Sequence, residues 1–157
     1  MKTWLKVLLI TLGAAVPAFV LGPIIWPPDP HGAVPAGPQL VLFMVLAALE
    51  SLAFGLGVAF ISYGLPLVRR VASHSRAHAW MAFSATAWLL VSWWPHDNMH
   101  IHNGGDLAGM LVIEYLFHVS LMMAGAILAY TLVRVFPTAT TTGRAPDQYI
   151  AHAATGD

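Results

Sequence analysis

Three histidines and an aspartate lie close together in the segment PHDNMHIHNGGD: His96, Asp97, His100 and His102. In an extended backbone alternate residues point the same way, so the imidazoles of His100 and His102 can address one ion. His96 and His100 are four residues apart and share a face if a helix continues past Pro95. Imidazole suits copper, zinc and iron, so the spacing predicts a transition-metal site in this segment.

Three further ionisable residues, Glu50, Glu114 and His118, fall inside long apolar segments. An ionisable group in the hydrocarbon of a bilayer costs at least a few kcal/mol, so such groups face the interior of a bundle and have partners. Glu114 and His118 are four apart and share a helical face. Glu50 and His118 each lie about 18 Å along their helices from the predicted outer ends, at about 1.5 Å per residue. We therefore expect these two residues to meet.

The predicted ligands thus come from both regions. The leading candidates are His100, His102, Glu114, His118 and Glu50, followed by His96 and Asp97. The alternative for the buried groups is a Glu–His contact that only fixes helix register. The alternative for the histidine-rich segment is a solvated loop near lipid headgroups.

The composition indicates which kind of protein must position these groups. Hydrophobic residues make up 58% of the 157 residues and charged residues 9%, whereas a typical soluble domain carries about 25% charged residues. Lipid is the solvent that tolerates such a surface. The chain has no cysteine, which excludes disulfides and thiolate metal sites. Its seven Lys and Arg are scattered, so no nucleic-acid partner is expected.

Hydropathy predicts an all-α, polytopic integral membrane protein with a four-transmembrane-helix bundle in residues 1–136. The spans are residues 4–26, 38–68, 79–94 and 107–136, with a polar loop carrying the histidines between the third and fourth. Residues 137–157 lack apolar periodicity and are predicted to be a disordered cytoplasmic tail. Cleavage of the first segment as a signal peptide is the alternative to its retention as an anchor.

The basic residues predict the orientation. They occur at the start of the first span, between the second and third, and after the fourth: Lys2, Lys6, Arg69, Arg70, Arg76, Arg134 and Arg144. By the positive-inside rule both termini are cytoplasmic, and the histidine-rich loop faces outward from an inner or plasma membrane.

These features predict an outward-facing His/carboxylate site for a transition metal, with copper ahead of zinc and iron. The ligand chemistry is similar to that of the copper-binding subunits of membrane-bound methane and ammonia monooxygenases, although the ligand spacing differs and the chain is shorter. The expected role is a small subunit or metal carrier rather than a stand-alone enzyme, with a protein partner or homo-oligomer besides the bilayer. The alternatives are a structural subunit of a larger membrane complex and a proton-coupled transporter.

Overall fold

The protein is described from a computed structural model that covers residues 2–32, 34–72, 75–104 and 107–135. Within these ranges all regular structure is helical. The five helices are α1 (Thr3–Ile25), α2 (Pro38–Val71), α3 (Arg76–Val91), α4 (Trp93–Asn103) and α5 (Leu107–Val135). The predicted tail at 137–157 lies outside the described residues.

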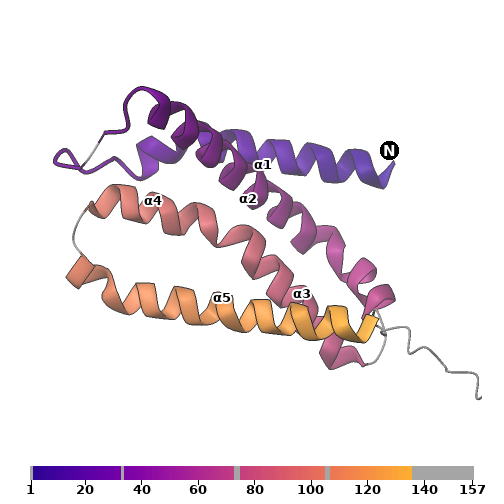
Figure 1. Ribbon diagram of the computed structural model, residues 1–157. Helices are drawn as coiled ribbons and strands as arrows, with labels where there is room; N and C mark the ends of the chain where they lie inside the picture. Colours follow the sequence, from indigo (N-terminus) through magenta and orange to yellow (C-terminus); the bar gives the residue numbers. More distant parts are fainter. Residues whose placement is uncertain (1, 33, 73–74, 105–106, 136–157) are drawn as a thin grey trace, which may run out of the picture.

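The helices run back and forth along one direction (Figure 1). α1 and α2 form an antiparallel pair, and Gly55 of α2 lies so close to Thr11 and Ala15 of α1 that a side chain there would collide with them. α3 and α4 follow each other as one bent rod, with α5 antiparallel beside it. Ser75 caps α3 by accepting a hydrogen bond from the His78 amide at 3.1 Å, which satisfies a donor that the first turn leaves unpaired.

In the described part of the chain three helices are long and apolar enough to cross a membrane: α1, α2 and the 28-residue stretch Ala108–Val135 of α5. Most of their large hydrophobic side chains are exposed on the isolated chain, for example Val20, Leu67 and Val133. Such a surface suits lipid rather than water. α3, the predicted third span, has 16 residues and does not reach that length by itself.

The histidine-bearing segment differs from the prediction. A loop was predicted after Pro95, but residues 93–103 form helix α4, so that prediction is wrong for these residues. The helix is interrupted at Ser92, which ends α3 and precedes α4. Pro95 therefore lies in the first turn of α4. Proline is tolerated there because amide groups of a first turn have no intrahelical acceptor.

The end of α4 is tied to the loop between α1 and α2. The Asp29 amide donates to the Ile101 carbonyl at 3.1 Å. Gly104 ends α4 with a φ of 58°, and a side chain at this position would collide with Asp29. Only glycine adopts this conformation readily, so Gly104 lets the α1–α2 loop close over the end of α4.

The basic helix ends lie at the opposite end of the molecule from α4 (Figure 1). The described basic residues are in the first turns of α1 and α3 and the last turns of α2 and α5, or next to them: Lys2, Lys6, Arg69, Arg70, Arg76 and Arg134. The bundle therefore has one basic end and one end that carries the histidines.

Candidate metal centre

Two histidines of α4 share one face of the helix. His96 and His100 are one turn apart, and their Nε2 atoms are 3.3 Å from each other. The His96 side chain is 7% exposed and that of His100 34%. The sequence predicted this shared face on the condition that a helix extends past Pro95, and α4 meets that condition.

Glu114 of α5 completes a cluster with these histidines. Its Oε1 atom lies 2.7 Å from His100 Nε2 and 3.3 Å from His96 Nε2. His96, His100 and Glu114 each offer one ligand atom, and these atoms all lie within 4.8 Å of one another, so among the described residues they form a group that could hold a metal ion. We call these three residues the His/Glu cluster.

The spacing of the three atoms suits a metal ion. Ligands bound at about 2.0–2.1 Å in a tetrahedron lie about 3.3 Å apart. Two of the three separations in the cluster equal 3.3 Å, and the third, between His100 Nε2 and Glu114 Oε1, is 2.7 Å. Glu114 Oε1 is buried, and no hydrogen bond of acceptable geometry reaches it from the described residues despite its closeness to His100. A buried carboxylate oxygen without a donor is costly, and a cation between the three atoms removes that cost.

Neighbouring groups hold the ring of His96 in place. Its Nδ1–H donates to Asp97 Oδ1 at 3.0 Å, which directs the lone pair of Nε2 toward Glu114. Such a carboxylate–imidazole contact fixes the tautomer of a metal-binding histidine and makes it more basic. Phe117 stacks on the same ring at 3.6 Å between centroids, and Trp93 packs edge-on against both rings.

His118 lies beside the cluster, but one of its nitrogens is already engaged. Its Nδ1 donates to the Glu114 backbone carbonyl at 2.8 Å and is 3.5 Å from Glu114 Oε2. The side chain is 58% exposed, and its ring centroid is 5.7 Å from that of His96. His118 is therefore a neighbour of the three ligand atoms and not one of them.

His102 points to a different part of the molecule. Its Nδ1 donates to the Pro27 carbonyl at 2.7 Å, and its ring packs edge-on against Trp26. The His-x-His pattern is meaningful in an extended strand, whereas residues two apart on a helix point in nearly opposite directions. The helical backbone of α4 therefore separates His102 from His100.

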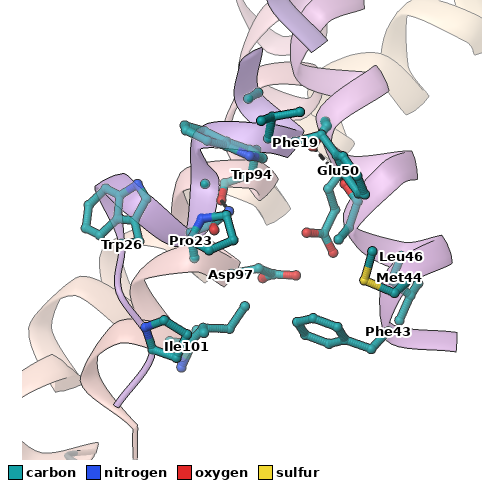
Figure 2. Close-up of a pocket in the computed structure, with 18 residues that line it drawn as sticks. Phe19, Pro23, Trp26, Phe43, Met44, Leu46, Glu50, Trp94, Asp97 and Ile101 are labelled. Carbon is teal, nitrogen blue, oxygen red and sulfur yellow. Dashed lines mark hydrogen bonds between the residues drawn. The ribbon is translucent and has the colours of Figure 1, made fainter. Parts of the chain in front are cut away.

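Glu50 faces Asp97 and not His118. Figure 2 shows the carboxyl groups of Glu50 and Asp97 turned toward each other in a pocket that both residues line. His118 lies on the other side of α4, next to His96. The expected contact between Glu50 and His118 is thus replaced by contacts that each residue makes with α4.

The sequence did not predict the packing of aromatic side chains on His96 or the burial of a histidine at the basic end of the bundle. Phe117 lies three residues after Glu114, so helical periodicity places both on one face and was the available signal. His78, near the basic end, is buried, and its Nε2 bonds with Thr131 Oγ1 at 3.0 Å.

The described part of the chain thus has the features of a helical membrane protein with a two-histidine, one-glutamate cluster between α4 and α5. No family model, curated protein or solved structure matches the chain.

Proposed function

We propose that the chain crosses the membrane four times and that α3 and α4 together make the third crossing. α3, with 16 residues, is about 24 Å long at 1.5 Å per residue, which is less than the hydrocarbon core of about 30 Å. With the 11 residues of α4 the bent rod reaches about 40 Å. The basic residues at the end remote from α4 support a cytoplasmic location of both termini and an outward location of the His/Glu cluster.

The function we propose is transition-metal binding on the outer side of the membrane at His96, His100 and Glu114. The observation that carries the proposal is the convergence of His96 Nε2, His100 Nε2 and Glu114 Oε1, with that oxygen buried and lacking a hydrogen bond from the described residues. Among common divalent ions Cu²⁺ has the highest affinity for a nitrogen and oxygen site. Copper is therefore our first choice, ahead of zinc and iron.

The number of ligands supports a carrier or a small subunit of a larger membrane complex. Three protein ligands leave a fourth coordination position for water or for a group from a partner. A carrier needs such a position, because the receiving protein must bind the ion before the first ligands release it. A subunit uses the same position to share the ion with its partner chain.

Metal analysis of the full chain tests this proposal. The protein is purified without a histidine tag or chelator, and bound copper, zinc and iron are measured before and after reloading with each ion. We expect one ion per chain in the wild type, and a loss of binding in the H96A/H100A double variant and in E114A. H102A and H31A are matched controls that remove exposed imidazoles outside the cluster.

Two results oppose the proposal. A wild-type protein that takes up no metal at a defined ratio excludes a metal site. A wild type and an H96A/H100A variant that bind equally show that the ion is held by other groups. Thermal unfolding of each variant shows whether a loss of metal reflects a loss of the fold.

A further inference from the structure

A second feature of the same end of the molecule is a pocket of about 610 Å³ between α1, α2 and α4 (Figure 2). Its volume is in the range of sites for small organic molecules, which are about 300–1,000 Å³. Most of its wall is apolar, and four aromatic side chains contribute to it: Phe19, Trp26, Phe43 and Trp94. Gly22 keeps the wall open, because a side chain there would press against Asn98.

The charged groups on this wall are all acidic. Glu50 comes from α2 and Asp97 from α4, and their carboxyl groups face each other (Figure 2). Asn98 donates its amide hydrogen to the Trp94 carbonyl at 2.7 Å, which leaves the Asn98 carbonyl oxygen as a further acceptor. Acceptors from two helices thus meet on one wall of an apolar pocket.

Asp97 accepts a hydrogen bond from His96 Nδ1, and the described lining residues offer no permanent cation to the acidic pair. None of them is Lys or Arg, and the basic helix ends lie at the other end of the bundle. The Ser51 hydroxyl donates to the Ala47 carbonyl. His100, also on the wall, directs Nε2 to Glu114, and the indole N–H of Trp26 is a neutral donor.

We propose that this pocket binds a lipophilic organic cation, with an ammonium group between Glu50 and Asp97 and an apolar body against the aromatic wall. Opposite charges attract strongly where water is scarce. Aromatic rings add to the binding of ammonium groups. The pocket adjoins the His/Glu cluster, because His100 lines the pocket and Asp97 accepts a hydrogen bond from His96. The inference requires the two carboxyl groups and the aromatic wall, and it does not require a bound metal.

A comparison of a cationic and a neutral ligand of the same shape tests the proposal. The full chain is placed in nanodiscs of zwitterionic phosphatidylcholine, which removes binding to anionic lipid. The binding of 4-phenylbutylammonium and of 4-phenylbutanol is then measured by calorimetry. We expect saturable binding of the ammonium compound at least tenfold tighter than that of the alcohol.

Variants locate the site. E50Q and D97N should each weaken ammonium binding by tenfold or more, and the double variant should bind both compounds equally. E114Q should retain ammonium binding, which separates the pocket from the His/Glu cluster. If E50Q fails to fold, A47F tests the same site by filling the pocket while both carboxylates remain, and it should abolish binding.

Three outcomes contradict the proposal. Equal affinity of the wild type for the amine and the alcohol shows an apolar site without charge recognition. Unchanged ammonium binding in folded D97N or A47F places the cation elsewhere. An absence of saturable ammonium binding to the wild type shows that the pocket does not accept this class of ligand.

Discussion

The imidazole of His96 lies flat on the ring of Phe117, with the ring planes 9° apart. The two residues come from α4 and α5, so this contact fixes the rotation of one helix against the other at the His/Glu cluster. A ring clamped on one face by Phe117 and bonded at Nδ1 to Asp97 has little freedom to turn. His96 Nε2 is therefore held toward Glu114.

Replacement of Phe117 by leucine should weaken metal binding without removing a ligand. Groups that orient metal ligands typically contribute about 10–100-fold in affinity, and we expect the lower end of that range for F117L. Competition with a chelator of known affinity measures the change. F83L is the matched control, because Phe83 stacks on Phe60 outside the cluster. An equal loss in both variants points to general destabilisation.

Replacement of Asp97 by asparagine should also reduce metal affinity. The change keeps the shape of the side chain but removes the charge that makes His96 a stronger ligand. We expect a loss of about 10–100-fold by the same chelator competition. The control is N103A, on the exposed end of α4. If D97N binds metal as tightly as the wild type, Asp97 does not contribute to metal affinity through His96.

Acidification should release the metal. An imidazole must be neutral to bind an ion, so protons compete for His96 Nε2 and His100 Nε2. Apparent affinity falls as pH decreases, by up to about tenfold per pH unit for each histidine that takes up a proton. Chelator competition at several pH values measures this slope. H100A should have a shallower slope than the wild type, and an identical slope excludes His100 as a ligand.

The orientation in the membrane can be tested with single cysteines, because the chain has none of its own. Cysteines in place of Ala36 and Asn103 should react with an impermeant thiol reagent on intact cells. A cysteine in place of Ala77, at the basic end, should react only after lysis. The reverse pattern places the His/Glu cluster on the cytoplasmic side and removes the case for an outward site.

Gly104 should be required for the stability of the α4 end. G104A places a side chain at a φ of 58° and against Asp29, and we expect it to lower the free energy of unfolding by about 1–2 kcal/mol. G125A is the matched control, because nothing lies within 4 Å of a side chain added there. Alanine should be neutral or stabilising in that helix. Thermal unfolding in detergent compares the two variants.

The long helices could be predicted from the sequence, because apolar runs of this length have few alternatives. The helix that begins at Pro38 and the one that begins at Leu107 start where they were predicted. The break at Ser92 could not be predicted, since Pro95 can follow the end of one helix or lie in the first turn of the next. The histidines were therefore assigned to a loop.

The candidate ligands were recognised by type, but their grouping could not be derived. Periodicity shows which residues share a face within one helix, so Glu114 and His118 were correctly placed together. How far one helix is rotated against another depends on packing of side chains such as Phe117, which periodicity does not encode. The sequence therefore paired Glu50 with His118, whereas α4 lies between them.

Neighbouring residues on an α-helix point about 100° apart. Because of this offset, α4 contributes residues both to the His/Glu cluster and to the pocket. His96 belongs to the cluster on the α5 side, and Asp97 to the pocket on the α2 side. A single inserted or deleted residue near the Ser92 break would turn α4 by that angle and misalign both sites together. The length of the chain before α4 thus sets the register of the cluster and of the pocket at the same time.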